Sequence, residues 1–253
     1  MTTIHRYLAL ILALIFAVCG TAQAAPTAKA VSIVLVHGVL IDGSSWRGVY
    51  NILTRHGYRV SVVQQPLTGF DDDVSATRRI LDQQDGPIVL VGHSYGGAII
   101  TVAGADPRVK ALVYVAALQP DVGETPGEVA PPKPPADADL RPSKDGFVFI
   151  DPAKFATDVA ADLPKADAEF LAHAQMPVAG AAFSTRLAVA AWHDKPSYAI
   201  IATDDRALDA ERARWMAQRA GSKVTEIKAS HAVLISQPRT VARVIEAAAR
   251  SVE

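Results

Sequence analysis

One serine in the chain lies in a pattern that suits it to act as a nucleophile. In the segment Gly92-His93-Ser94-Tyr95-Gly96, glycines stand two residues before and two residues after the serine. The apolar run 88–91 precedes this segment and predicts a strand, and the apolar residues after it predict a helix. Ser94 is therefore expected at a sharp strand-to-helix turn, where small flanking residues prevent side-chain collisions. The start of a helix also stabilises negative charge that develops nearby.

A serine hydroxyl is a weak nucleophile at neutral pH, so it needs a general base. Among the seven histidines, His231 follows the last predicted strand, residues 224–228. In a parallel sheet this position lies at the same edge as Ser94. The order serine, acid, histidine along the chain is also one that known catalytic triads use. His231 is the expected base, whereas His93 is expected to face away from the serine across the turn.

The base in turn needs a carboxylate that holds its tautomer and stabilises the imidazolium. The predicted strand 197–203 runs directly into Asp204 and Asp205, at the same edge of the sheet, and either could serve. Asp121, which follows the fourth predicted strand, is a further candidate. Asp194 fits less well because it precedes its strand rather than following it.

An oxyanion formed during acyl transfer needs two backbone N–H donors. Tyr95 follows the nucleophile and is expected to supply one donor. The loop after the first strand, His37-Gly38-Val39-Leu40, is expected to supply the other. Val39 is the preferred donor in this loop, with Leu40 as the second choice.

Strands and helices alternate along most of the chain. Strands are expected at 31–36, 58–63, 88–91, 109–117, 197–203 and 224–228, and helices at 44–55 (capped by Ser44 or Ser45), 71–84, 98–105, 209–220 and from 238 onward. This alternation predicts a mostly parallel α/β sheet of about six strands with helices on both faces. Residues 119–196 are expected to form a small cap insertion, rich in proline at first, with weak helices near 152–162, 165–175 and 184–192.

The N-terminus differs from the rest of the chain. A basic start with Arg6, an apolar run over 7–18 and the tripeptide Ala22-Gln23-Ala24 are typical of a secretory signal peptide. Twelve apolar residues are short for a bilayer span, which needs about 20; an uncleaved anchor is the alternative. Residues 1–24 are therefore predicted to be removed, leaving a single domain of 25–253 exported to the periplasm or the medium. Cys19, the only cysteine, would leave with them, which excludes disulfides, zinc–thiolate sites and cysteine catalysis.

The charge of the chain and its loop motifs argue against nucleic acids and nucleotides as partners. The formal net charge is −1 and charges of both signs are interspersed, so the chain has no electrostatic footprint for nucleic acid. The turn at Ser94 also lacks the glycine and lysine patterns of nucleotide-binding loops. We expect no metal or organic cofactor, and no membrane association after signal cleavage.

Taken together, these motifs resemble the α/β-hydrolase superfamily over almost all of residues 31–250. The segments that carry the resemblance are His37-Gly38, Gly92–Gly97, Asp204–Arg206 and Ser230-His231. The pattern is most similar to a small branch that holds plant methyl-ester esterases, hydroxynitrile lyases and bacterial esterase-like proteins. In that branch the acid matches the second aspartate, in a pattern like Asp205-Arg-Ala-Leu, and the oxyanion donor matches Val39. The resemblance therefore implies a triad of Ser94, Asp205 and His231.

Two departures from the lyases favour hydrolysis. Hydroxynitrile lyases of this branch carry a threonine where Gly38 stands and a lysine where Ala232 stands. Epoxide hydrolases and dehalogenases of this fold use aspartate as nucleophile, which Ser94 argues against. The sequence therefore predicts a serine hydrolase that cleaves a small carboxylic ester through an acyl-enzyme. A lactonase, amidase or perhydrolase and haloperoxidase-type activity on the same triad, or a non-catalytic binding protein, are the alternatives.

Overall fold

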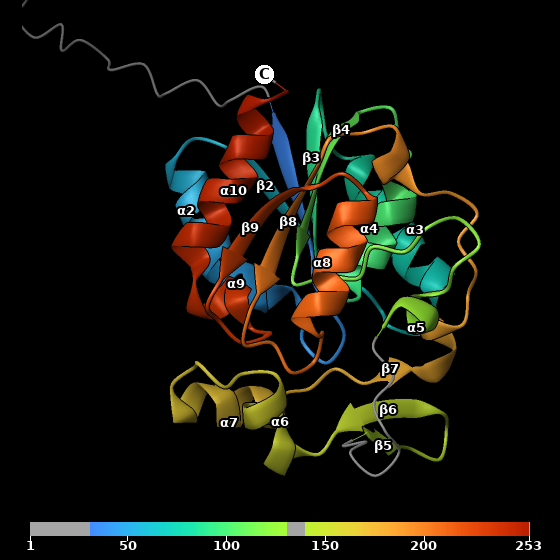
Figure 1. Ribbon diagram of the computed structural model, residues 1–253, viewed down its shortest axis with the longest axis vertical. Coiled ribbons are helices and arrows are strands. Elements are labelled where there is room, and N and C mark those ends of the chain that lie inside the picture. Colours follow the sequence, from blue (N-terminus) through green and yellow to red (C-terminus); the bar gives the residue numbers. More distant parts are fainter. Residues whose placement is uncertain (1–30, 131–139, 253) are drawn as a thin grey trace, which may run out of the picture.

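The computed structural model describes residues 31–130 and 140–252. Its centre is a six-stranded sheet in the order β2-β1-β3-β4-β8-β9, and every pairing in it is parallel. The expected parallel sheet is thus confirmed (Figure 1). The strands are β1 (Ser32–Val36), β2 (Arg59–Val63), β3 (Ile88–His93), β4 (Val109–Val115), β8 (Ser197–Ala202) and β9 (Lys223–Ile227).

Burial follows the position of each strand in the sheet. Every residue of β1, β3 and β8 is buried, because helices cover both faces and leave no side for polar residues. The edge strands β2 and β9 keep exposed or half-buried residues. This explains why the central strands have continuous apolar sequences rather than an alternating pattern.

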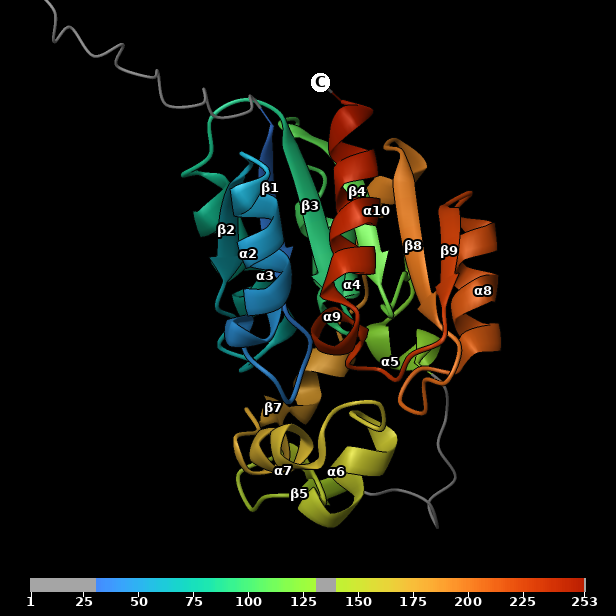
Figure 2. The ribbon, with the colours of Figure 1, turned by 90° about the vertical axis from the view of Figure 1, so that its left-hand side faces the viewer.

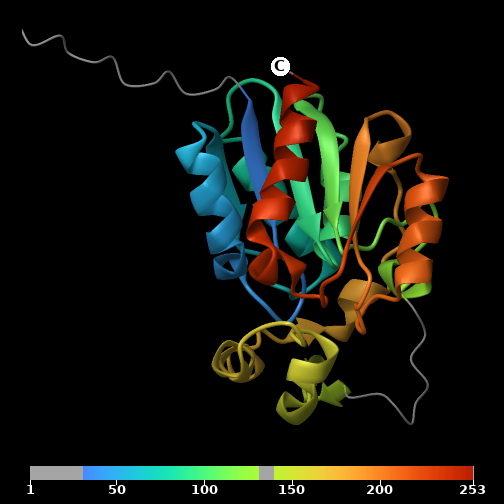
Figure 3. The same cartoon turned by 60° about the vertical axis from the view of Figure 1, so that its left-hand side comes forward.

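The helices form two layers around the sheet (Figures 1 and 3). One face packs against α2 (Arg47–Arg55), α9 (Val233–Ser236) and α10 (Pro238–Arg250). The other face packs against α3 (Phe70–Leu81), α4 (Gly96–Ala103) and α8 (Ala210–Arg219). The doubly covered sheet accounts for the high apolar fraction of the sequence.

The region before α2 differs from the sequence expectation. Its first turn is a 3₁₀ helix, η2 (Gly43–Trp46), and α2 begins only after it. The side chain of Asp42 caps this turn by accepting a hydrogen bond from the N–H of Ser44 at 2.7 Å. Asp42, rather than Ser44 or Ser45, is therefore the capping residue.

The segment between β4 and β8 crosses the carboxyl ends of the strands as a cap (Figure 2). It includes a small antiparallel sheet in the order β5-β6-β7, which the sequence did not indicate. The elements of the cap are α5 (Pro126–Val129), β5 (Leu140–Pro142), β6 (Phe147–Ile150), α6 (Pro152–Asp158), α7 (Lys165–His173), β7 (Val178–Ala179) and the 3₁₀ turns η4 (Gly180–Phe183) and η5 (Ala191–His193).

The helix predicted over 184–192 is wrong. Only the 3₁₀ turn η5 forms in this stretch, at its end. Leu187 instead pairs with the chain at 123–124: its N–H donates to the Glu124 carbonyl at 2.9 Å, and its carbonyl accepts from Gly123 at 2.8 Å. Long-range backbone bonds thus replace the local bonds that a helix would have made.

Several predictions concern residues that lie outside the described part of the chain. These are the signal peptide of residues 1–24, the cleavage site after Ala24 and the position of Cys19. Within residues 31–130 and 140–252, no helix combines the length and the apolar character that a membrane span requires.

The buried centre of the sheet leads to a first prediction. Ile33 in β1 is fully buried, whereas Val224 in the edge strand β9 is 47% exposed. We expect Ile33→Ala to lower the free energy of unfolding by about 2–5 kcal/mol, because it removes buried methylene groups and leaves a cavity. Val224→Ala is the matched control and should cost less than about 1 kcal/mol. Urea denaturation followed by circular dichroism measures both; equal losses would contradict this packing.

Candidate active site

The turn between β3 and α4 holds Ser94 in a strained conformation. Its φ is +53°, a region that residues with a Cβ rarely adopt. Three backbone hydrogen bonds fix the turn: the Ser94 N–H donates to Val115 at 3.2 Å, and its carbonyl accepts from Gly97 at 2.9 Å and from Leu118 at 3.0 Å. The neighbouring strand β4 and its following loop therefore hold the serine in place.

The glycines around Ser94 are required by close backbone approaches. A Cβ on Gly92 would lie 2.5 Å from the Gly96 carbonyl oxygen, and a Cβ on Gly96 would lie 2.5 Å from the His37 carbonyl oxygen. A Cβ on Gly38 would lie 2.7 Å from the Cβ of Ser94. Because any side chain at position 38 would displace the serine, the threonine expected of a hydroxynitrile lyase does not fit this arrangement.

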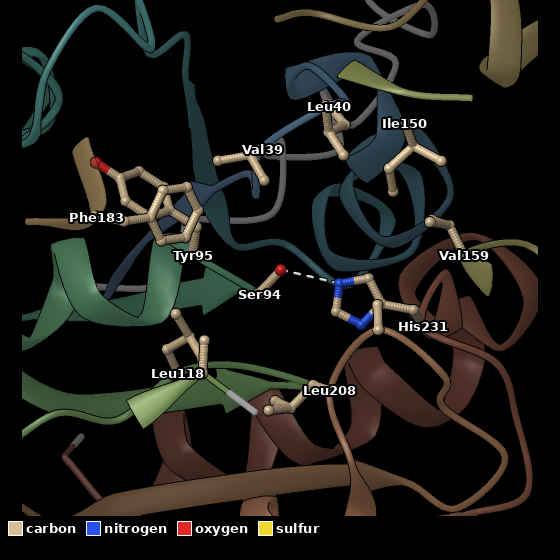
Figure 4. A pocket seen from close by; sticks show the side chains of 12 residues that line it. Val39, Leu40, Ser94, Tyr95, Leu118, Ile150, Val159, Phe183, Leu208 and His231 are labelled. Atoms are coloured by element: carbon tan, nitrogen blue, oxygen red, sulfur yellow. Dashed lines mark hydrogen bonds between the residues drawn. The ribbon is translucent and has the colours of Figure 1, made fainter. Parts of the chain in front are cut away.

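A chain of hydrogen bonds connects three of the predicted residues. His231 Nε2 lies 2.8 Å from Ser94 Oγ, and His231 Nδ1 lies 2.7 Å from Asp205 Oδ2 (Figure 4 shows the first contact). The other carboxylate oxygen of Asp205 accepts from the N–H groups of Ala207 and Leu208, both at 2.8 Å. The side chains of His231 and Asp205 are only 8% and 2% exposed. The geometry leaves Nε2 as the acceptor for a serine proton.

The other candidate acids lie elsewhere. Asp204 is exposed, although it is adjacent to Asp205 in the sequence. Asp121 pairs with His193 instead, with 2.7 Å between Oδ1 and Nε2. Asp194 lies at the end of η5. The structure thus brings Asp205, and none of these three aspartates, to His231.

The two predicted oxyanion donors come from separate segments, the loop after β1 and the turn after β3. Val39 and Tyr95 both contribute to the cavity at Ser94, as does Leu40, the second choice. Neither Val39 nor Tyr95 donates its backbone N–H to another residue in the described part of the chain. Leu40 has a φ of +66°, so the loop after β1 turns sharply at this point. The N–H groups of Val39 and Tyr95 are therefore available to a substrate oxygen in this cavity.

The cavity beside Ser94 has a volume of about 140 Å³ and a mostly apolar lining. Ile150, Val159 and Phe183 line it from the cap, and Leu118 and Leu208 line it from loops at the end of the sheet (Figure 4). The aromatic rings of Phe183 and Tyr95 lie 5.3 Å apart along one wall. No described group of three or more His, Cys, Asp or Glu side chains is placed to bind a metal ion.

Comparison with known proteins agrees with this architecture. A family model described as "Alpha/beta hydrolase family" matches residues 33–244. The chain belongs to the α/β-hydrolase family.

Similar proteins cover nearly the whole of this α/β-hydrolase. The α/β-hydrolase nvfD of Aspergillus novofumigatus is 27% identical over 243 residues, which cover 86% of this chain and 96% of the relative. Polyneuridine aldehyde esterase of Rauvolfia serpentina is 26% identical over 245 residues, which cover 83% and 92%. The crystal structure of a pyrethroid hydrolase from Sphingobium faniae JZ-2 shares the fold, with a TM-score of 0.74 at 24% identity over 87% of this chain and 98% of that one.

His93, which was expected only to face away from Ser94, contacts another residue of the site of this hydrolase. It does not bond the serine, as expected, but its ring lies 4.8 Å from the His231 ring, centroid to centroid. Its Nε2 lies 3.0 Å from the His231 carbonyl oxygen and donates to it. Complete burial keeps the pKa of His93 well below its ordinary value, so the ring is neutral. Only the packing of the His231 loop onto β3 reveals this contact.

His37 supports the loop after β1, which carries Val39, in a similar way. Its Nδ1 lies 2.7 Å from the Gly38 carbonyl oxygen, and its Nε2 accepts from the Gln65 N–H at 3.0 Å. Burial lowers the pKa of His37, which agrees with a neutral ring that donates at one nitrogen and accepts at the other. His37 therefore ties the loop after β1 to the loop after β2.

Asp73 is a buried carboxyl that the sequence placed only at a helix start. Its two oxygens accept from the Tyr95 hydroxyl at 2.9 Å and from the Leu67 N–H at 2.8 Å. It thereby fixes Tyr95, whose backbone N–H is one of the two predicted oxyanion donors. Burial raises the pKa of Asp73 to about 6, although both hydrogen bonds work in the opposite direction. The neighbouring Asp71 and Asp72 are exposed, so only the tertiary structure distinguishes the three.

This raised pKa predicts a pH-dependent stability. The folded chain keeps a proton on Asp73 that the unfolded chain releases above its ordinary pKa of 3.8. The stabilisation is therefore complete below about pH 4 and is lost as the pH rises through about 6. Asn at position 73 cannot ionise, so the variant does not lose this stability as the pH rises. We therefore expect the free energy of unfolding of Asp73→Asn, relative to that of the wild type, to be about 2–3 kcal/mol higher at pH 7 than at pH 4.

Urea denaturation at a series of pH values measures this difference. Asp71→Asn, which removes an exposed carboxylate from the same helical turn, is the matched control. If both variants change relative to the wild type by the same amount, burial of Asp73 does not cause the effect.

Proposed function

We propose that this α/β-hydrolase is a serine esterase that cleaves small, neutral carboxylic esters through an acyl-enzyme on Ser94. The observation that carries the proposal is the hydrogen-bonded chain from Ser94 through His231 to Asp205, which opens into an apolar cavity. Such a chain activates a hydroxyl that is otherwise a weak nucleophile. An apolar cavity suits the uncharged groups on either side of an ester bond.

In the first step, Ser94 Oγ attacks the ester carbonyl carbon while His231 Nε2, at 2.8 Å, takes the hydroxyl proton. The carboxylate of Asp205 holds the Nδ1–H and stabilises the imidazolium that forms. The N–H groups of Ala207 and Leu208 keep that carboxylate in position. The histidine therefore accepts the proton without having to reorient.

In the tetrahedral intermediate, the former carbonyl oxygen carries the negative charge. The N–H groups of Val39 and Tyr95 would donate to it, and removal of one such donor typically slows turnover by about 10²–10³-fold. His231 then returns its proton to the alcohol oxygen as the C–O bond breaks. In the second half, His231 takes a proton from water, the hydroxide adds to the acyl group, and the acid leaves as Ser94 regains its proton.

The names of similar proteins support an ester as the substrate. Polyneuridine aldehyde esterase from Rauvolfia serpentina, several methylesterases of Arabidopsis thaliana and a carbendazim-hydrolysing esterase from Nocardioides are among the relatives. Their shared feature is an esterase description rather than one particular substrate. We infer the preference for uncharged acyl and alcohol groups from the apolar lining of the cavity instead.

We also propose that the mature enzyme acts outside the cytoplasm. The support is the sequence of residues 1–24, with its basic start, short apolar run and Ala-x-Ala site. The partner of the exported enzyme would be the small-molecule ester itself.

Replacement of the nucleophile tests the proposed chemistry. We expect Ser94→Ala to lower kcat on p-nitrophenyl acetate by at least about 10⁴-fold, because the whole triad acts through this oxygen. The melting temperature should change little, since only one oxygen is removed. Ser44→Ala, at an exposed serine, is the matched control and should retain full activity.

Labelling with a fluorophosphonate probe distinguishes an enzyme from a binding protein that has lost its chemistry. Wild type and Ser44→Ala should gain the mass of one phosphonyl group, and Ser94→Ala should gain none. Full esterase activity in Ser94→Ala, or a wild type that reacts with neither substrate nor probe, would contradict the proposal.

The cavity lining predicts a preference among substrates. We expect kcat/KM for p-nitrophenyl butyrate to exceed that for p-nitrophenyl hemisuccinate by at least about tenfold, because burial of the free carboxylate of the hemisuccinate among apolar side chains costs free energy. Phe183→Ala should shift the optimum toward longer acyl chains, since this ring forms one cavity wall. Phe170→Ala is the matched control, because Phe170 is 70% exposed on the outer side of the cap. An unchanged chain-length profile in Phe183→Ala would place the acyl group elsewhere.

A further inference from the structure

The residues on both sides of His231 are tied to the cap. The Ser230 hydroxyl donates to a carboxylate oxygen of Asp162 and also lies 3.1 Å from the Val159 carbonyl oxygen. On the other side, the N–H of Ala232 donates to the same Val159 carbonyl at 2.9 Å. Asp162 and Val159 belong to the connection between α6 and α7, about 70 residues earlier in the chain. Two neighbours of one histidine thus share a single anchoring segment.

Packing strengthens this connection. The apolar residues of α6 and α7 and of the turn between them form one buried cluster with Leu40 and Ile41 of the loop after β1 and with Ala232. In the cap this cluster includes Phe155, Val159, Ala160, Ala168 and Ala172. The α6–α7 segment therefore packs against both the loop after β1 and the loop that carries His231, rather than forming a core of its own.

The loop that carries His231, between β9 and α9, is also held from the side of the sheet. His231 follows the edge strand β9 by four residues, outside any regular element. The backbone bonds that hold this stretch from the sheet side are Asp204 N–H to the Ala229 carbonyl at 3.1 Å and the His93 ring to the His231 carbonyl. Ser230 is the residue of this loop whose side chain bonds the cap. A displacement of about 1 Å in a catalytic group can cost about 10²-fold in rate, so the anchor matters for proton transfer.

The charge of Asp162 makes the anchor stronger than a bond between neutral groups. Partial burial tends to raise the pKa of Asp162, but hydrogen bonding, first from Ser230 and then from Ser236 and the backbone, outweighs it and leaves the pKa below its ordinary value. The carboxylate is therefore ionised at neutral pH, and a hydroxyl that donates to a charged oxygen forms a shorter and stronger bond. Asp162 is otherwise exposed, so it has no part in the buried core.

We propose that Asp162 is a positioning residue for His231, which it holds in place from the cap through the hydroxyl of Ser230. The inference rests on the proposed esterase function. Val159 also connects this contact to the cavity: its side chain lines the cavity, while its carbonyl oxygen accepts from the Ala232 N–H and lies 3.1 Å from the Ser230 hydroxyl. A substrate group that packs against Val159 therefore contacts the same segment that positions His231. The fit of the acyl group in the cavity then affects the position of the base and, through it, kcat.

Steady-state kinetics on p-nitrophenyl butyrate tests the proposal. We expect Asp162→Ala and Ser230→Ala each to lower kcat by about tenfold while KM changes by less than about twofold. The double variant should lose no more than Ser230→Ala alone, because that substitution already removes the Ser230–Asp162 bond. Asp162→Asn keeps an acceptor oxygen and Ser230→Thr keeps the hydroxyl, so both should recover most of the lost rate.

Asp167→Ala is the matched control, since it removes another exposed carboxylate from the first turn of α7. It should retain wild-type kcat. Titration with the fluorophosphonate probe counts functional sites, so kcat is expressed per reactive serine, and a variant that merely unfolds loses sites rather than rate per site.

The outcomes separate the two proposals. A wild type with no Ser94-dependent turnover would overturn the proposed function itself. An active wild type in which Asp162→Ala keeps its kcat per reactive site would overturn the positioning role alone. A rise in KM at unchanged kcat would also overturn it, because Asp162 would then act on substrate binding rather than on the histidine.

Discussion

The close approach of three backbone segments around Ser94 is the constraint on which the rest of the site depends. The end of β3, the start of α4 and the end of β1 meet at distances that leave no room for a Cβ at Gly92 or Gly96. A positive φ at a residue with a Cβ costs of order 1–3 kcal/mol, which the surrounding structure must offset. Backbone bonds to β4 and its loop do so here, and they leave the serine hydroxyl free to face the cavity.

This tight turn has a consequence for the polar groups beneath it. His37 and His93 are buried under this turn, which lowers the pKa of each ring and keeps it neutral, and each donates to a backbone carbonyl of a loop at the site. Asp73 performs a related task for Tyr95. None of the three bonds Ser94, yet together they fix the loop after β1, the loop that carries His231, and Tyr95. The site is thus supported by buried hydrogen bonds rather than by surface ion pairs.

The cap completes the site from the opposite side. It supplies apolar walls through Ile150, Val159 and Phe183. Its α6–α7 segment shares a buried cluster with the oxyanion loop and bonds the neighbours of His231. Because the same segment forms a cavity wall and holds the neighbours of His231, the shape of the cavity and the position of this histidine are parts of one packing arrangement. This distinguishes the cap from a lid that only excludes water.

The sequence by itself determined the features that depend on local spacing and on strand ends. The need for a glycine at position 92 follows from sterics within five residues, since a Cβ there would meet Gly96. Ser94, Asp205 and His231 each follow a strand of one parallel sheet, whose carboxyl ends meet at one edge. The choice of Asp205 over Asp204 came from family resemblance. The tertiary structure decided what long-range contacts control: the irregular chain at 187, the β5-β6-β7 sheet, the buried state of Asp73, and the contacts of His93 and Asp162. Such contacts join residues far apart in the chain, so no local pattern records them.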